Sequence, residues 1–450
     1  MPAALWAPIF ERPDLVAKAL WGDIPSPDAL GLGTTAACEA ALIEARTLLG
    51  LARSRRDGPT AAIAVYKHTS PILAGVTLDD ALRKEPRKLS TKRALTWIHL
   101  ADLHFGAPKD AERHRFDQPA VMRAIARDVS ECAAKPPDFV FVTGDIAWSG
   151  QSSEYEEARA WLTELMQAAG VTIDKLRLVP GNHDVDRSRA NTKPTLRAHS
   201  EIRAAPEEID NELSDAALRA ALADKLGAYL DFVKAITPGH PRPLVNGLDW
   251  SERVASIAGA NGKIRVAGLS TVWISDGSDG RLHKGQAVPF IRNMILGERQ
   301  MREAFGDLDD DELLFLLTHH PPEWLHRDSA EEFAKALSRR AYVHLCGHFH
   351  DAPQGLGQKR FGVHSAAARY VAGAAHGDPS ESRKHGYSWA AIRYNAAASQ
   401  WEAGFSPRIY DEEREIMRPD AARYNLDEEG FAWEPIKVPW RPPVSVEIHA

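Results

Sequence analysis

The sequence predicts an α/β fold, because short apolar runs that read as buried strands alternate with longer stretches that have the apolar spacing of helices. A length of 450 residues and a hydrophobic content of 44% allow a sizeable core and two or three domains. Polar residues follow several of the apolar runs, and active sites of open α/β sheets lie at the carboxyl ends of strands. These observations together indicate an α/β protein with a site at one sheet edge.

The alternation begins clearly at residue 95. Residues 95–100 are expected to form a strand, 120–132 an amphipathic helix, and 139–142 a strand covered on both faces. Residues 154–169 should form the next helix and 176–179 the third strand. The order strand, loop, helix, strand is typical of parallel sheets.

Residues 186–260 interrupt this order. Their pattern is mostly helical, with 216–233 as the clearest helix, and we expect an insertion over the active edge. Strands resume after it, and the last two should close a second sheet. The strands expected here are 264–270, 313–317, 342–346, 362–370 and 387–394.

The chain divides into three regions. Residues 1–93 form an N-terminal segment of unknown role, small and mainly helical, in which the basic run 83–93 reads as an exposed linker or, alternatively, a phosphate or nucleic-acid contact. Residues 94–410 form the main domain, and 411–450 a tail packed on it. The N-terminal segment could recruit a partner protein, although no motif identifies one, and the oligomeric state stays open.

The charge balance bears on nucleic-acid binding. A formal net charge of −7 gives no support for binding through a basic body. A local basic groove stays open, because net charge says nothing about distribution. Its candidates are Arg187, Arg189, Lys193 and Arg197, which could equally form a solvated helix face.

The cysteines and the hydropathy predict a location. Three widely spaced cysteines argue against a disulfide framework and suit a reducing cytosol. No apolar stretch is long enough for a membrane span, and the first residues lack the pattern of a secretory signal. We therefore expect a cytoplasmic protein without membrane contact.

Five polar segments follow the predicted strands. They supply carboxylates, an amide and several imidazoles, which are ligands for divalent first-row metals. Two such ions would stabilise both oxygens of an in-line displacement at phosphorus. The segments are Asp102-Leu103-His104, Gly144-Asp145, Gly181-Asn182-His183-Asp184, His319-His320 and Gly347-His348-Phe349-His350. They make this chain a candidate two-metal hydrolase.

In this order the five segments resemble the signature of the calcineurin-like metallophosphoesterase superfamily, over roughly Leu95 to Tyr394. The resemblance implies a four-layer α/β/β/α sandwich and two divalent metal ions, for which Mn, Fe and Zn all suit the mixed shell. It implies that Asp102, His104 and His350 hold one metal, Asn182, His319 and His348 the other, and that Asp145 bridges them. His183 would stabilise the transition state or protonate the leaving oxygen, and Asp184 would orient it.

The reaction that follows is phosphodiester hydrolysis, in which a metal-bound hydroxide attacks phosphorus in line. A cyclic nucleotide or another small diester is the expected substrate, with the insertion as the specificity element. A DNA or RNA nuclease of the same superfamily is the main alternative. An inactive scaffold or regulatory protein is a more remote one.

Other residues near these segments have structural interpretations. We expect His320 to be structural, with lining of the substrate pocket as the alternative. Cys346 should pack in the core. Trp148 and Trp273 should also be core residues, although either could stack on a base.

Overall fold

The structure is a computed structural model, and the part of the chain that it describes begins at Ala94. The N-terminal segment 1–93, including its basic run, and His350 lie outside the described residues. The described residues within Leu89–Pro419 and Phe431–Ala450 belong to one compact unit. The described residues are 94–107, 118–132, 136–236, 248–254, 262–276, 279, 293–338, 340, 342–348, 367–371 (backbone), 385–422 and 424–440.

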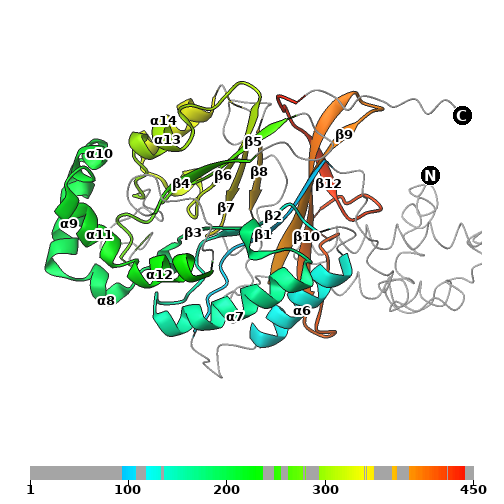
Figure 1. Ribbon diagram of the computed structural model, residues 1–450, viewed down its shortest axis with the longest axis horizontal. Helices are drawn as coiled ribbons and strands as arrows, with labels where there is room; N and C mark the ends of the chain where they lie inside the picture. Colours follow the sequence, from blue (N-terminus) through cyan, green and yellow to red (C-terminus); the bar gives the residue numbers. More distant parts are fainter. Residues whose placement is uncertain are drawn as a thin grey trace, which may run out of the picture. The chain divides into compact units, whose positions relative to one another are not determined.

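The first sheet has the strand order β11-β10-β9-β1-β2-β3, and β12 also pairs with β10 (Figure 1). The strands β1, β2 and β3 are parallel, as their continuous apolar runs predict, and the remaining pairs are antiparallel. The bounds are β1 (Leu95–Leu100), β2 (Phe139–Thr143), β3 (Leu176–Val179), β9 (Gly386–Asn395), β10 (Gln400–Asp411), β11 (Ile416–Pro419) and β12 (Ala432–Pro435).

The second sheet has the order β4-β5-β6-β7-β8. Strands β5 to β8 are parallel, and β4 pairs antiparallel with β5. The bounds are β4 (Trp250–Val254), β5 (Lys263–Gly268), β6 (Glu312–Leu317), β7 (Tyr342–Cys346) and β8 (Ala367–Val371).

Two expectations about the late strands need correction. The stretch 387–394 was expected in the second sheet, but β9 pairs with β1 in the first sheet. β9 occupies the edge of β1 that lies opposite β2. Strand spacing along the sequence does not indicate which sheet edge a late strand joins. The tail 411–450 also does more than pack on the domain, because β11 and β12 extend the first sheet.

The two sheets pack face to face through aromatic side chains. The ring centroid of Trp97 on β1 lies 5.0 Å from that of Phe315 on β6, and Phe141 on β2 stacks on the same ring at 5.8 Å. On the other face of the first sheet, Ile98 and Val140 belong to a core that includes residues of α6 (Gln118–Cys132) and α7 (Ser152–Ala168).

Helices cover both outer faces. Figure 1 shows α6 and α7 along the first sheet, and α13 (Glu298–Phe305) and α14 (Arg327–Leu337) along the second. This arrangement confirms the predicted four-layer α/β/β/α sandwich. Among the described residues, none of the helices combines the length and apolarity that a membrane crossing requires.

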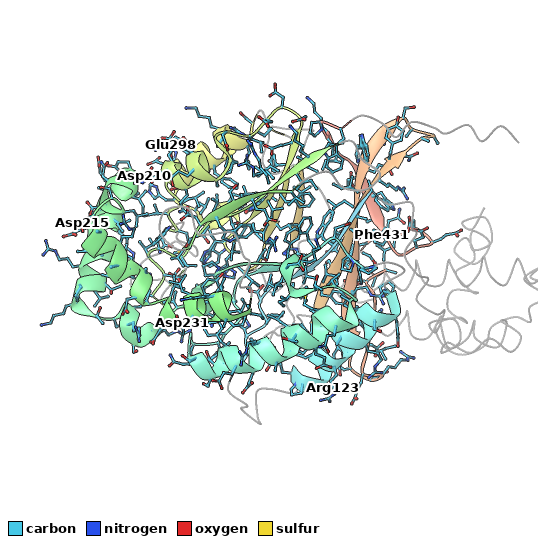
Figure 2. All side chains as sticks on the ribbon, in the orientation of Figure 1. Arg123, Asp210, Asp215, Asp231, Glu298 and Phe431 are labelled. Carbon is cyan, nitrogen blue, oxygen red and sulfur yellow. The ribbon has the colours of Figure 1, made fainter. Side chains whose placement is uncertain are left out.

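The helical insertion is anchored by hydrogen bonds to the half of the sandwich that contains the second sheet. The expected helix 216–233 is two helices, and the buried ammonium of Lys225 between them donates to the carbonyls of Trp273 (2.7 Å) and Ser275 (2.8 Å) after β5. Asp210 accepts the backbone N–H of Arg299 (2.8 Å) at the start of α13, and Figure 2 shows Asp210 beside Glu298. The bounds are α8 (Arg187–Ala190), α9 (Lys193–Ala204), α10 (Ile209–Glu212), α11 (Ala216–Asp224) and α12 (Gly227–Ile236).

Candidate metal centre

The polar segments meet at the carboxyl ends of strands from both sheets. Asp102 follows β1, Asp145 follows β2, and Asn182 begins a short 3-10 turn (Asn182–Asp184) after β3. His319 and His348 follow β6 and β7 of the second sheet. The parallel pairing within each sheet carries these residues to a common edge.

Asp145 lies between two sets of donors. Its Oδ2 is 3.3 Å from Nε2 of His104 and 3.4 Å from Nε2 of His319. The ligand atoms of Asp102, Asp145 and His319 lie within 4.8 Å of one another, and so do those of His104, Asp145 and His183. A carboxylate that belongs to both sets has the position that a bridging ligand requires.

A second cluster forms around Asn182. Its Oδ1 lies 3.0 Å from Nε2 of His319 and 3.0 Å from Nδ1 of His348, and these two nitrogens are 3.2 Å apart. The other nitrogen of His319, Nδ1, donates to the carbonyl of Thr143 (2.8 Å), so its Nε2 lone pair faces the cluster. Three electron-pair donors that converge in this way fit a cation.

The backbone of the site is unusual. Asp102, His104, Asp145 and His348 all have φ in the left-handed region, at 56°, 51°, 53° and 71°. Residues other than glycine rarely adopt this conformation, and where they do it is common at functional sites. The surrounding structure therefore holds these four side chains in directions that an ordinary strand end would not give them.

Gly144 allows the loops to approach one another. Its φ is +88°, and a Cβ there would lie 2.6 Å from Nδ1 of His319 and 2.7 Å from the backbone nitrogen of Gly181. No other residue type would fit this position without moving the side chain of His319 or the backbone of Gly181.

His183 is oriented by backbone groups. Its Nδ1 donates to the carbonyl of Trp148 (2.8 Å), and its backbone N–H donates to Oδ1 of Asp145 (2.7 Å). The ring lies 4.7 Å from that of His104. Its proton is thereby fixed on Nδ1 in the neutral ring, and Nε2 is the nitrogen that can exchange a proton.

Asp184 accepts hydrogen bonds from the loops after β2 and β3. Its carboxylate accepts the backbone N–H groups of Ala147 (2.9 Å) and Gly181 (2.8 Å) and the hydroxyl of Tyr155 (2.9 Å). It therefore ties the loops after β2 and β3 together, and the Trp148 carbonyl orients His183. A carbonyl acceptor has no signature in the sequence, so sequence reasoning could not identify it.

The ionisable groups of the site shift one another's pKa values. Burial would raise the pKa of Asp145, but the neighbouring imidazoles of His319 and His183 outweigh it and hold that pKa well below its usual value. Burial would lower the pKa of His319, but the Asp145 carboxylate reverses this and raises it to about 9. Burial, together with the charge of Asp145, raises the pKa of Asp184 to about 7. Asp145 is thus an anionic centre that stabilises positive charge beside it.

The remaining predicted residues lie as follows. Trp148 is half-buried, with its ring 5.3 Å from His104 and 4.8 Å from His183, so it borders the site. Trp273 and Cys346 are fully buried, as the core interpretation predicts. His320 is also buried, next to the ligand cluster.

The family model described as calcineurin-like phosphoesterase matches residues 95–352, more than half of the chain. An uncharacterized metallophosphoesterase-like protein, YydB, of Bacillus subtilis (strain 168) is 24% identical over 261 residues, which are 57% of this chain. The match covers 49% of YydB, so this chain spans about half the length of that curated relative.

Two solved structures are similar at low identity. A 5'-nucleotidase from Candida albicans SC5314 is 12% identical with a TM-score of 0.37, over 76% of this chain and 56% of that one. The purple acid phosphatase PPD1 from yellow lupin (Lupinus luteus) seeds is 11% identical with a TM-score of 0.38, over 70% of this chain and 51% of that one. On the family match over residues 95–352, this chain belongs to the calcineurin-like phosphoesterase family.

Proposed function

We propose that this protein is a phosphodiesterase that works with two divalent metal ions. The observation that carries the proposal is the position of Asp145, whose carboxylate lies between His104 and His319 at 3.3 Å and 3.4 Å. One carboxylate shared by two donor sets suits a pair of cations better than a single one. Membership of the phosphoesterase family supports hydrolysis of a phosphoric ester.

The ligands divide between two ions in this proposal. Asp102, His104 and His350 would hold one ion, and Asn182, His319 and His348 the other, with Asp145 shared. Such ions neutralise phosphate charge and lower the pKa of water when bound. Mn, Fe and Zn all accept mixed imidazole and carboxylate ligands, so the donor set does not choose among them.

His183 would act on the leaving group. The Trp148 carbonyl keeps a proton on Nδ1 and fixes the ring, so a second proton on Nε2 can be transferred to the departing oxygen. Asp184 would contribute indirectly, because it holds the loop that carries the Trp148 carbonyl.

A small diester, such as a cyclic nucleotide, is favoured over nucleic acid. Two of the four candidate basic residues are already paired: Arg189 with Asp224 (2.7 Å) and Arg197 with Glu201 (2.7 Å). Compensated charges attract phosphates less strongly than free ones. A nuclease is therefore the second choice.

The wide spacing of the cysteines supports a cytoplasmic location.

The test is hydrolysis of bis(p-nitrophenyl) phosphate with metal content measured on the same samples. Removal of metal and the substitution Asp145→Ala should each abolish turnover. Asp231→Ala is the matched control, because Asp231 is an exposed carboxylate on α12 (Figure 2). Turnover that persists in metal-free Asp145→Ala protein would contradict the two-metal proposal, and faster hydrolysis of p-nitrophenyl phosphate would contradict the preference for diesters.

A further inference from the structure

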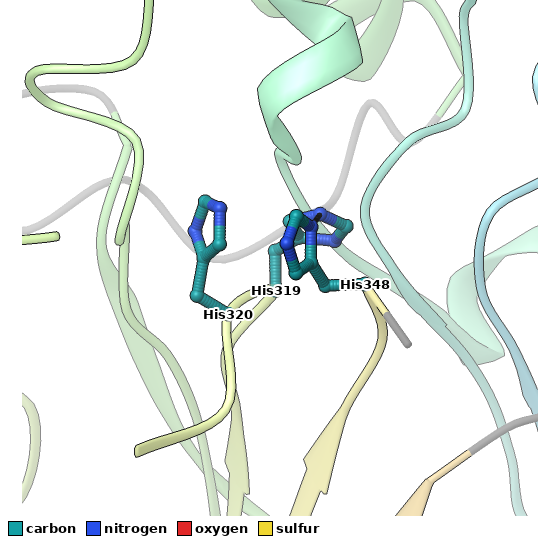
Figure 3. A group of neighbouring side chains, drawn as sticks. All are labelled: His319, His320 and His348. Carbon is teal, nitrogen blue, oxygen red and sulfur yellow. Dashed lines mark hydrogen bonds between the residues drawn. The ribbon is translucent and has the colours of Figure 1, made fainter. Parts of the chain in front are cut away.

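His320 lies next to the ligand cluster without belonging to it in the proposal above. Its side chain is completely buried, and its ring centroid is 4.9 Å from that of His319 and 4.5 Å from that of His348. Figure 3 shows the three imidazoles rising from the same edge, with one ring nitrogen of His320 on the side of the other two rings. The ring is therefore placed to act on whatever binds there.

Thr271, in the loop after β5, contacts the Nδ1 side of the His320 ring. Its Oγ1 accepts the backbone N–H of His320 (3.1 Å) and lies 2.9 Å from Nδ1 of the same residue. Thr271 is fully buried, and within the described ranges its hydroxyl proton has no acceptor other than Nδ1. A buried hydroxyl proton is almost always donated, and donation to Nδ1 would leave the ring proton on Nε2.

A proton on Nε2 would exclude metal binding by this nitrogen and would make it a hydrogen-bond donor. In that tautomer Nε2 cannot bind a metal ion, so His320 would not be a further ligand despite its closeness to His319 and His348. Nε2 is buried, and it has no hydrogen-bond partner among the residues that the structure describes. A buried donor without an acceptor is unfavourable, which points to an oxygen atom supplied from outside the protein.

We propose that Nε2–H of His320 donates a hydrogen bond to a non-bridging phosphoryl oxygen of the substrate. This rests on the proposed function, which brings a phosphate to cations held by His319 and His348. An anionic oxygen is a stronger acceptor than water, so the bond would add affinity at the step where phosphate charge is bound. His320 then binds substrate, and Thr271 is a positioning residue that acts through it.

The first experiment separates substrate binding from metal binding. Mn²⁺ titration and inorganic phosphate titration of the Mn²⁺-loaded full chain are measured for wild type, His320→Leu and His320→Gln. We expect unchanged Mn²⁺ stoichiometry in all three, phosphate affinity lowered about ten- to a hundredfold in His320→Leu, and recovery in His320→Gln, whose amide can donate from the same region. Thr271→Val should weaken phosphate binding by a smaller factor.

His344→Leu provides a matched control. His344 is a buried imidazole within β7, and its Nε2 pairs with Oγ1 of Thr318 at 2.8 Å. Its loss should lower the melting temperature and leave phosphate affinity unchanged. Equal phosphate affinity in wild type and His320→Leu overturns the proposal, and so does loss of Mn²⁺ from His320→Leu, since that would make His320 a ligand.

A spectroscopic test does not depend on the folding of any variant. Long-range ¹H–¹⁵N spectra of the Zn²⁺-loaded wild type should show His320 protonated on Nε2, and addition of phosphate should shift that proton downfield. Protonation on Nδ1, or no shift with phosphate, overturns the proposal. Wild type that binds phosphate through His320 but does not hydrolyse the diester would contradict the proposed reaction alone.

Discussion

The backbone N–H of His348 lies 3.2 Å from each carboxylate oxygen of Asp102, although 246 positions separate the two residues. Asp102 follows β1 of the first sheet, and His348 follows β7 of the second. The proposed ligand shell therefore includes a direct hydrogen bond between the two halves of the sandwich. The site is complete only when the sheets are packed.

Asp102→Asn should separate the metal role of this carboxylate from its structural role. The amide oxygen can still accept the His348 N–H, so the melting temperature should change little. The lost negative charge should lower Mn²⁺ affinity more than about tenfold. Calorimetric titration and thermal unfolding measure the two effects, with Asp231→Asn as the exposed control. Unchanged affinity would remove Asp102 from the ligand set.

Gly144→Ala should weaken metal binding, and Gly170→Ala is the control for the cost of an alanine at positive φ. The added methyl would lie 2.6 Å from Nδ1 of His319, so a ligand must move as well as the backbone. Gly170 has a similar φ of +68°, but a Cβ there meets only Cγ of Pro136, at 3.6 Å. Gly170→Ala should cost about 1–2 kcal/mol of stability and keep metal affinity, whereas Gly144→Ala should lose metal. Equal metal affinity in both variants would contradict the close approach.

The fold, and the strand ends at which the candidate ligands lie, were accessible from the sequence because they follow from strand patterns. Continuous apolar runs such as 139–142 predict parallel, doubly covered strands, and the residues after them must then share an edge. That argument places Asp145 and Asn182 at one edge without any knowledge of their distances.

Features made by the backbone were not accessible. The left-handed conformations of Asp102 and His104 carry no residue signature, since glycine is the usual choice there. The Trp148 carbonyl that orients His183, and the pairing of β9 with β1, depend on tertiary approach alone. The hydroxyl of Thr271 falls in the same class, because 49 residues separate it from His320.

The buried pair of Asp128 and Arg408 should contribute to stability and not to metal binding. Nε of Arg408 on β10 lies 2.8 Å from Oδ2 of Asp128 on α6, and the Tyr387 hydroxyl donates to the same oxygen at 2.6 Å. Arg408→Met leaves a buried carboxylate without its cation and should cost about 3–5 kcal/mol. Arg327→Met, which breaks an exposed pair with Glu331, should leave the free energy of unfolding nearly unchanged. Denaturant unfolding compares the two, and a smaller loss for Arg408→Met would contradict the role of the pair.

The buried carboxyl of Asp249 should make the free energy of unfolding depend on pH. Its side chain is fully buried, and burial, aided by the charge of Glu303 on α13, raises its pKa from 3.8 to about 7. The folded protein therefore binds more protons than the unfolded chain between about pH 4 and 7, so the free energy of unfolding from this residue falls as pH rises through that window. Asp249→Asn should remove this fall and increase stability at pH 8 by about 2–4 kcal/mol. Denaturant unfolding at pH 5 and pH 8 measures the difference, with Asp231→Asn expected to keep the wild-type slope. A wild-type slope in Asp249→Asn would show that the Asp249 carboxyl is ionised when buried and is stabilised by a partner.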